Sequence, residues 1–220
     1  KYITAEDVGM ETADMDLVRE VTPYVTGISE SKGGAGNPSP ITAYGVFMGM
    51  KAAAKYKFDN DILEDKKVFV QGIGHVGEAL VEHLVNEGAN VVISDINQER
   101  LDLVSQKYGV TIYRGDDLYS EEMDVYAPCA LGATVNDDTI YKLKAKIIAG
   151  AANNQLARED IGELLQQRGI LYAPDYVINA GGVIDIFHQR MESSSNEALR
   201  AHIEQIGETL KEIYTRAEQE

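Results

Sequence analysis

Apolar residues recur along most of the chain at two alternating spacings, one typical of strands and the other of helices. From residue 67 onward, short apolar runs predict strands at 68–71, 91–94, 110–112, 125–127, 147–149 and 170–172. Helices with recognisable start and stop signals are expected between them at 75–88, 97–109 and 160–169, with Asn97 and Asp160 as caps. This alternation predicts an α/β fold with a doubly wound parallel sheet (Rossmann), which binds ligands at the carboxyl ends of its strands.

Two segments lie outside this alternation. In the first, residues 2–5 and 24–27 predict short strands and 14–20 a short helix, followed by a breaker-rich hinge at 31–40. A helix capped by Ser39, with Pro40 in its first turn, should then run to about residue 57. The second is a long C-terminal helix whose apolar stripe is formed by Leu199, Ile203, Ile206, Leu210, Ile213 and Ala217. We expect this stripe to dock on the chain's own domain; docking on a further domain or another subunit is the alternative.

The strongest local motif is the turn Gly72-Ile73-Gly74-His75-Val76-Gly77, which lies between a predicted strand and a predicted helix. The first glycine permits the tight turn, the second leaves room for a pyrophosphate, and the third lets the helix pack closely on the strand. Asp95 ends the next strand, 21 residues beyond Gly74. Its carboxylate would accept hydrogen bonds from the adenosine ribose and repel a 2′-phosphate, which favours NAD over NADP. Arg100 weakens that preference because it is close in sequence, and a turn without a ligand is the other alternative.

Composition narrows the classes of partner. The chain has 20 Lys and Arg residues against 36 Asp and Glu, and its net charge of −16 argues against nucleic acid and anionic membrane surfaces. No apolar run approaches the roughly 20 residues of a membrane span, and no signal peptide opens the sequence. The single cysteine, Cys129, excludes an internal disulfide, which suits a reducing, cytoplasmic compartment. No cluster with metal-ligand spacing is present in the sequence, so no metal is expected.

Several phrases together resemble one family. They are residues 4–9, 36–46, 72–77, 127–132, 149–156 and 173–183, in this order along nearly the whole chain. On these phrases the chain resembles the glutamate/leucine/phenylalanine/valine dehydrogenase family, and most of all its leucine dehydrogenase branch. The resemblance implies reversible oxidative deamination of a branched-chain L-amino acid, leucine first and valine or isoleucine next, to a 2-oxo acid and ammonia with NAD.

The resemblance also implies roles for individual residues. Asp7 matches the family's catalytic aspartate, and the substrate would be bound by Ala5, Asn154, Val183 and Ile186. The cofactor-binding set would be Thr42, Gly72, Ile73, Gly74, His75, Val76, Gly77, Glu78, Asp95, Ile96, Cys129, Ala130, Ala152, Asn153 and Asn179. Within that set Thr42 would contact the nicotinamide amide, and Cys129 and Ala130 would line the adenosine side.

The chain departs from the family pattern in two respects. No segment matches the glycine–lysine phrase of the family's substrate domain, so we expect the cofactor-binding part without its catalytic lysines, inactive by itself. Asp185 stands where a neutral residue is usual. The expected domains are the end of the substrate domain (1–30), the NAD-binding domain (31–183) and a C-terminal helical segment (184–220), in a homo-oligomer. Rival hypotheses are a different Rossmann dehydrogenase and an NAD-binding or assembly module without catalysis.

Overall fold

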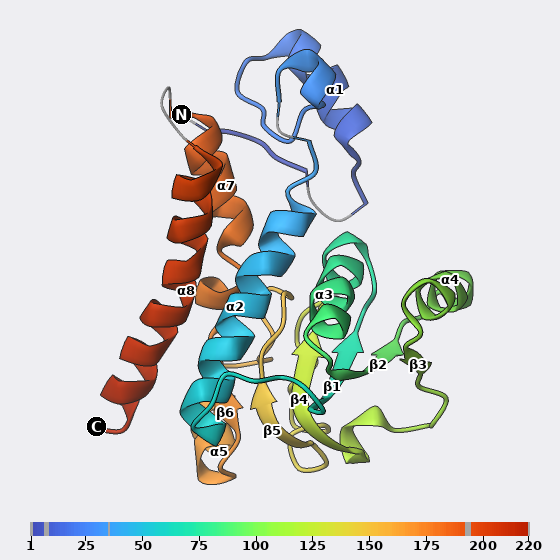
Figure 1. Ribbon diagram of the computed structural model, residues 1–220, viewed down its shortest axis with the longest axis vertical. Helices are drawn as coiled ribbons and strands as arrows, with labels where there is room; N and C mark the ends of the chain where they lie inside the picture. The colour runs from blue at the N-terminus through green and yellow to red at the C-terminus, as the bar shows by residue number, and fades with distance from the viewer. Residues whose placement is uncertain (1, 7–8, 35, 192–194, 220) are drawn as a thin grey trace.

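A six-stranded, entirely parallel sheet forms the centre of the computed structural model, which describes residues 2–6, 9–34, 36–191 and 195–219 (Figure 1). The strand order is β3-β2-β1-β4-β5-β6. The strands are β1 (Lys67–Gln71), β2 (Asn90–Ser94), β3 (Thr111–Ile112), β4 (Glu122–Pro128), β5 (Lys144–Ile148) and β6 (Leu171–Tyr172). The chain reverses its direction of travel across the sheet between β3 and β4, so β1 and β4 flank the switch point of a doubly wound fold. The predicted fold class is confirmed.

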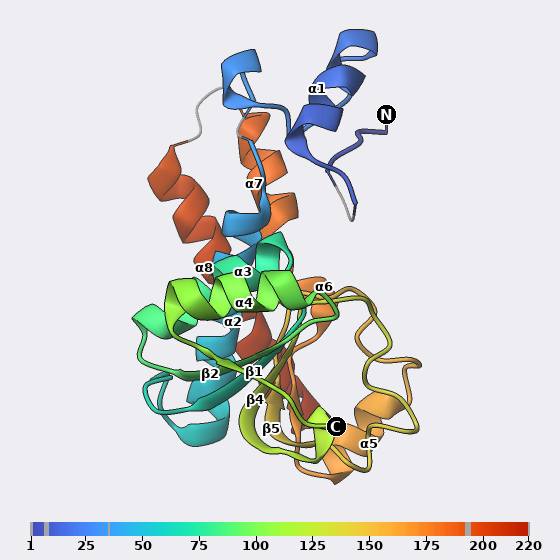
Figure 2. The same cartoon turned by 90° about the vertical axis from the view of Figure 1, so that its right-hand side faces the viewer.

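Helices cover both faces of this sheet (Figure 2). They are α2 (Ser39–Phe58), α3 (His75–Asn86), α4 (Gln98–Tyr108), α5 (Ile161–Gln167), α6 (Asp175–Ile178), α7 (Gly181–Gln189) and α8 (Asn196–Ala217). A further helix, α1 (Thr12–Val21), lies beyond the carboxyl ends of the strands (Figure 1). Alternate residues of β1 enter different cores: Val68 and Val70 pack with α2, α3, α4 and α8, whereas Phe69 faces the core that includes α5. This period of two on a strand buried on both faces explains the continuous apolar run in the sequence.

The C-terminal helix α8 packs along α2. Ile203, Ile206 and Leu210 are buried in the same core as the sheet, which confirms the expected docking on the chain's own domain. Contact is close because small residues line the seam: a Cβ added to Gly49 of α2 would lie 3.1 Å from Leu210 Cδ1. The stripe departs from the prediction at its end, where Ala217 is exposed and Tyr214 is buried instead.

The N-terminal residues form a small unit with its own core of Met15, Val25 and Ile28. Figure 1 shows this unit beyond the carboxyl ends of the strands, beside the start of α2 and α7. The two strands expected here are wrong: Thr4 and Val25 form one isolated parallel bridge. A single bridge suffices because two backbone bonds, Thr4 N to Tyr24 O and Thr26 N to Thr4 O, hold the two segments together.

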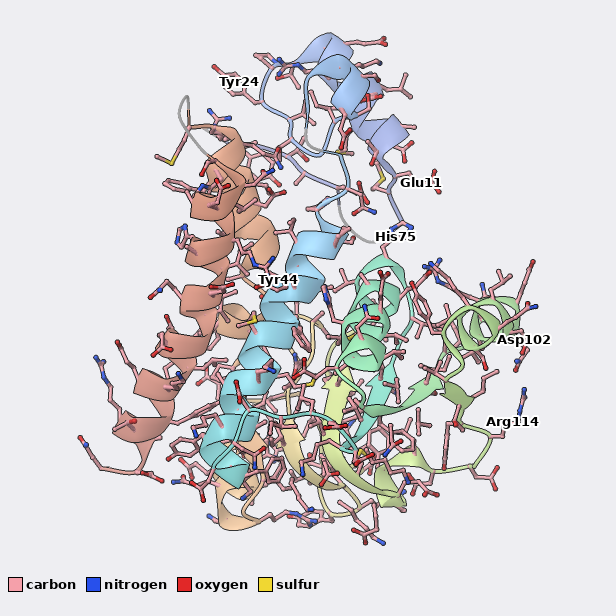
Figure 3. The ribbon with its side chains drawn as sticks, viewed as in Figure 1. Glu11, Tyr24, Tyr44, His75, Asp102 and Arg114 are labelled. Atoms are coloured by element: carbon pink, nitrogen blue, oxygen red, sulfur yellow. The ribbon has the colours of Figure 1, made fainter. Side chains whose placement is uncertain are left out.

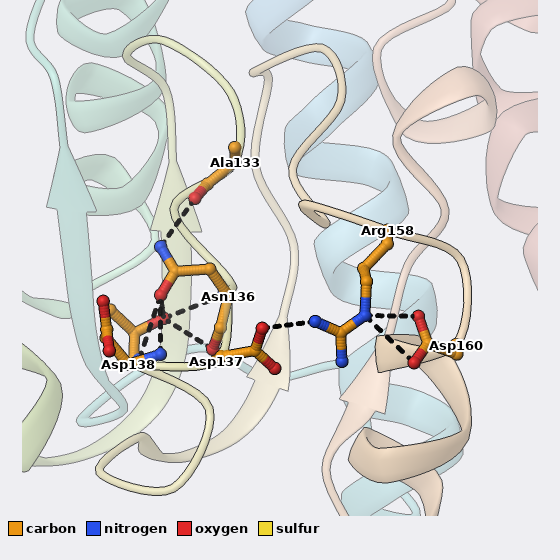
Figure 4. A network of polar contacts seen from close by, with 7 residues as sticks. Ala133, Asn136, Asp137, Asp138, Arg158 and Asp160 are labelled. Carbon is orange, nitrogen blue, oxygen red and sulfur yellow. Dashed lines mark hydrogen bonds and ion pairs between the residues drawn. The ribbon is translucent and has the colours of Figure 1, made fainter.

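Two of the predicted helix caps differ from the structure. Ser39 is the first residue of α2, and its N–H donates to Asn37 Oδ1 at 2.8 Å, so Asn37 supplies the oxygen expected from Ser39. Asp160 precedes α5 but caps no N–H, because its carboxylate accepts from Arg158 Nε at 2.8 and 3.0 Å. Figure 4 shows Arg158 also paired with Asp137, which ties two neighbouring loops together. Asn97 is a true cap and accepts from the Arg100 N–H at 3.1 Å.

Candidate functional site

The glycine turn after β1 has the close contacts that its three glycines were expected to allow. Gly72 has a φ of +92°, and a Cβ there would lie 2.6 Å from the backbone nitrogen of Ala130. A Cβ on Gly77 would lie 2.0 Å from the carbonyl oxygen of Gly72, so α3 approaches the strand as closely as backbone allows. In contrast, a Cβ on Gly74 would meet nothing within 4 Å. The turn therefore leaves open space at the one glycine that should face a pyrophosphate.

Asp95, at the end of β2, is fixed against this turn. Its Oδ2 accepts from the Ile73 N–H at 2.8 Å and its Oδ1 from the Asn97 N–H at 2.9 Å. Arg100 lies beside it, since its Nε donates to the carbonyl oxygen of the same Ile73. Ile96 is fully exposed. The carboxylate thus stands at the carboxyl edge of the sheet, where a ribose beside the turn would reach it.

The three residues at the start of α3 have different surroundings. The His75 side chain is exposed at the tip of the helix and faces the N-terminal unit (Figure 3), with its Nδ1 3.9 Å from Glu6 Oε1. Val76 is half-buried against the main core. Glu78 directs its carboxylate to Arg100 and Lys107 of α4, at 3.3 and 2.9 Å. Of this group, the Glu6–His75 contact was not anticipated from the sequence, because the two residues are far apart in it.

The segment after β4 borders the turn on its other side. Cys129 continues the strand pairing, since its N–H donates to the Gln71 carbonyl at 2.7 Å, and Ala130 is exposed next to Gly72. Burial raises the pKa of the Cys129 thiol to about 12, against a backbone hydrogen bond from Ala151 that lowers it. A thiol that stays protonated at neutral pH is a packing group rather than a nucleophile.

A tight loop after β5 carries the next three predicted residues. A Cβ on Gly150 would lie 2.3 Å from Pro128 O, and the Ala152 N–H donates to that oxygen at 2.9 Å, so the loop follows the end of β4. Asn153 is exposed and accepts from Asn179 Nδ2 at 2.6 Å. Asn154 has a φ of +53°. The structure therefore brings Ala152, Asn153 and Asn179 together at the same edge as the glycine turn.

The interior support of this loop is Gln155, which the sequence analysis did not single out. Its side chain is fully buried, and its Nε2 donates to Gly150 O at 2.8 Å and to Ala152 O at 3.0 Å. Its backbone N–H donates to Asp175 Oδ2 at 3.1 Å. The sequence does not indicate that Gln155 is buried, because its side chain is polar and its partners are main-chain carbonyls, which no residue type reveals.

Thr42 lies where α2 meets the start of α7. Its hydroxyl donates to Pro38 O at 3.1 Å, and a Cβ on Gly182 would lie 2.8 Å from Thr42 Oγ1. The absence of side chains at Gly181 and Gly182 lets the two helices approach. Thr42 is half-buried on this junction, on the same side of the molecule as the N-terminal unit.

The predicted substrate residues come from two separate parts of the chain. Ala5 is half-buried in the N-terminal unit, while Val183 and Ile186 lie on α7, where Val183 is 70% exposed. The two parts are linked by the Thr26 hydroxyl, which donates to Gln189 Oε1 at 3.0 Å. Asp7, the expected catalytic residue, lies outside the described residues. The structure thus joins the two segments that carry these residues.

Asp185 is buried on α7 and accepts from Gln189 Nε2 at 2.7 Å. Burial raises the pKa of this carboxyl, partly opposed by the hydrogen bond from Gln189. The Asp185 carboxyl thus binds Gln189 within α7, and Gln189 in turn binds Thr26 of the N-terminal unit.

The part of the chain that the structure describes brings no three His, Cys, Asp or Glu side chains together in an arrangement that could hold a metal ion. None of the helices formed by the described residues combines the length and the hydropathy that crossing a bilayer requires.

Comparison with known proteins places this geometry in a family. The family model "Glutamate/Leucine/Phenylalanine/Valine dehydrogenase" matches residues 33–99 and 93–220. Leucine dehydrogenase of Thermoactinomyces intermedius is 53% identical over 200 residues, which cover 91% of this chain and 55% of that protein. Valine dehydrogenase of Streptomyces coelicolor is 42% identical over 223 residues, covering 100% of this chain and 61% of that protein.

A solved structure agrees with these sequence matches. L-tryptophan dehydrogenase from Nostoc punctiforme superposes with a TM-score of 0.83 at 38% identity, covering 99% of this chain and 62% of that one. The chain spans a little over half the length of the curated relatives named here. The matched family, the parallel sheet and the glycine turn followed by Asp95 all agree, and the chain belongs to the glutamate/leucine/phenylalanine/valine dehydrogenase family.

Proposed function

We propose that this chain is the cofactor-binding part of an NAD-dependent dehydrogenase that deaminates a branched-chain L-amino acid. NAD is the cofactor of the leucine dehydrogenases that this chain resembles most. The observation that carries the proposal is the open space at Gly74. At the other two glycines of the turn, neighbouring backbone atoms leave no room for a side chain. Around that space lie the free N–H groups at the start of α3, which suit a pyrophosphate.

The chain's own residues would orient the cofactor along one edge of the sheet. Asp95 would accept hydrogen bonds from the adenosine ribose, and Cys129 and Ala130 would line the adenosine side. Asn153 and Asn179, already bonded to each other at 2.6 Å, would contact the nicotinamide ribose. Thr42 would hold the nicotinamide amide from the junction of α2 and α7. When bound, NAD supplies the hydride acceptor for the α-hydrogen of the amino acid.

Substrate binding is proposed for residues on both sides of this edge. Asn154 would contact the substrate, and Ala5, Val183 and Ile186 would form an apolar wall suited to a branched aliphatic side chain. Such a pocket distinguishes one methylene by only about 1–3 kcal/mol, so leucine, valine and isoleucine should all be accepted. Asp7 would move protons to and from the reacting nitrogen and water.

Turnover needs groups that these 220 residues do not supply. The sequence has no match to the family's glycine–lysine phrase, so the proposed chain binds cofactor but turns over slowly or not at all by itself. General acid–base catalysis and substrate positioning each contribute several orders of magnitude, and both would depend on those lysines. A cytoplasmic homo-oligomer is part of the same proposal.

The experiment that tests this function is an assay of the protein that contains this chain together with the family's substrate domain. We expect NADH production with L-leucine, L-valine and L-isoleucine, and ammonia-dependent oxidation of NADH with the corresponding 2-oxo acids. Activity on 2-hydroxy acids without ammonia would contradict the proposal and favour a different Rossmann dehydrogenase. The 220-residue chain assayed in parallel should be at least a hundredfold slower, since it lacks the lysines.

A further inference from the structure

Arg100 is positioned to contact the same ribose that Asp95 is proposed to bind. Both side chains bind the backbone of Ile73 in the glycine turn: Asp95 Oδ2 accepts from the Ile73 N–H, and Arg100 Nε donates to the Ile73 carbonyl. The guanidinium would therefore lie beside the hydroxyls of a ribose that Asp95 binds. An arginine in this place is what a Rossmann fold uses to bind the 2′-phosphate of NADP.

Glu78 engages that guanidinium. Its Oε2 lies 3.3 Å from Arg100 Nη2, and its Oε1 lies 2.9 Å from Lys107 Nζ. The Glu78 side chain is 27% exposed and that of Arg100 is 32% exposed. One carboxylate thus pairs with two cations of α4. Glu78, Arg100 and Lys107 line a groove of about 370 Å³, which gives their side chains room to reorient.

The charges in this cluster balance. Asp95 and Glu78 carry one negative charge each, and Arg100 and Lys107 one positive charge each. A 2′-phosphate, which is close to a dianion at neutral pH, would meet a cluster of no net charge with a carboxylate as its nearest group. An uncharged ribose hydroxyl needs no such compensation. The balance therefore favours NAD, and it depends on Glu78 as much as on Asp95.

We propose that Glu78 is a specificity-determining residue that keeps NADP out by occupying Arg100 and Lys107. The inference rests on the proposed cofactor site and deepens it. Glu78 acts through the two cations, so it is distinct from Asp95, which faces the ribose itself. Removing the Glu78 charge should release Arg100 toward a 2′-phosphate and leave the cluster with a net charge of +1.

The test compares the Kd of NADPH with that of NADH by titration, using the emission of the reduced nicotinamide and the purified chain, which has no tryptophan. In Glu78→Gln the ratio of the NADPH Kd to the NADH Kd should fall by about tenfold. The matched control is Glu82→Gln, one turn further along α3, whose carboxylate accepts from Tyr108 OH at 3.0 Å and loses the same charge. Adding Arg100→Gln to Glu78→Gln should abolish the gain.

The variants separate the role of Glu78 from that of Arg100 and from the cofactor site itself. A ratio in Glu78→Gln no lower than in Glu82→Gln would overturn the role of Glu78 while leaving the cofactor site intact. A gain that persists in the Glu78→Gln, Arg100→Gln double variant would overturn the role of Arg100. If the wild-type chain binds neither NADH nor NADPH, the proposed cofactor site fails and this inference fails with it.

Discussion

The hydroxyl of Thr26 donates to Gln189 Oε1 at 3.0 Å, although 163 residues separate the two in the sequence. Gln189 in turn donates to the buried Asp185 at 2.7 Å. The Thr26 N–H donates to Thr4 O, next to Ala5. A hydrogen-bonded path therefore joins the N-terminal unit to α7, and these are the two carriers of the proposed substrate wall.

Thr26→Val should loosen this junction. The substitution keeps the side-chain shape but leaves the half-buried Gln189 Oε1 without this donor, and a hydrogen bond of this kind contributes about 0.5–1.5 kcal/mol. We expect faster amide hydrogen exchange in residues 9–34 while the sheet keeps its protection, because the N-terminal unit has a separate small core. Thr215→Val on the exposed face of α8 is the control. Unchanged exchange in residues 9–34 would show that other contacts hold the unit.

Gly74→Ala and Gly77→Ala should have different effects, although they lie in the same turn. Alanine at 74 meets nothing within 4 Å, so the Tm should change little while NADH affinity falls at least tenfold. Alanine at 77 would place its Cβ 2.0 Å from Gly72 O, which should lower the free energy of unfolding by about 1–3 kcal/mol. NADH affinity should fall in this variant too. Thermal unfolding and NADH titration of both variants check this. Full NADH affinity in Gly74→Ala would place the pyrophosphate elsewhere.

Gln155→Leu should damage nicotinamide binding more than adenosine binding. The variant leaves the carbonyls of Gly150 and Ala152 without their donor and should destabilise the fold by about 1–3 kcal/mol. Because this loop carries Asn153, the Kd of NADH should rise severalfold, whereas the Kd of ADP, which lacks both the nicotinamide and its ribose, should change less. Gln166→Leu, on the exposed side of α5, is the control. Equal loss for both ligands would mean that Gln155 supports the fold generally.

Asp185→Asn should stabilise the chain at neutral pH. Burial raises the pKa of Asp185 above its ordinary value of 3.8, so the folded state holds the proton more tightly than the unfolded state does. The stability that this provides is fully present below pH 3.8 and is lost as the pH rises through the raised pKa. Asparagine keeps an acceptor for Gln189 without the buried charge. Its advantage, measured by urea unfolding, should therefore be larger at pH 7 than near pH 4.

The matched control for that measurement is Asp102→Asn. Asp102 also accepts from a glutamine on its own helix, Gln98 Nε2 at 2.8 Å, but it is exposed on α4. Comparison of the two variants separates the effect of burying the carboxyl from the effect of replacing an aspartate on a helix. If Asp185→Asn is less stable than the wild type at pH 7, the ionised carboxylate stabilises the fold through Gln189, contrary to this prediction.

Sequence pattern was sufficient for the sheet and the glycine turn because both depend on local chemistry. Strand β1 contains the three-residue apolar run Val68-Phe69-Val70 and ends just before the glycine turn, and only glycine fits at 72 and 77. The Asn97 cap is equally local, since its partner is three residues away. These features need no knowledge of distant partners.

Predictions failed or fell short where distant or competing partners decide. At the start of α2 the capping oxygen comes from Asn37, two residues before the predicted Ser39. At the start of α5 the Asp160 carboxylate caps no N–H because it binds Arg158 instead. The pairing of Glu78 with Arg100 and Lys107, which lie 22 and 29 residues further along the chain, gave no signal in the sequence. Gln155 is polar yet fully buried, because its partners are carbonyls of its own loop.

The most direct test of the central claim is a fluorescence titration of NADH with the purified wild-type chain. We expect saturable binding that is displaced by NAD and at least tenfold less well by NADP, because Asp95 and Glu78 disfavour a 2′-phosphate. Absence of NADH binding by the folded chain, or displacement by NADP as effective as by NAD, would contradict the proposed cofactor site.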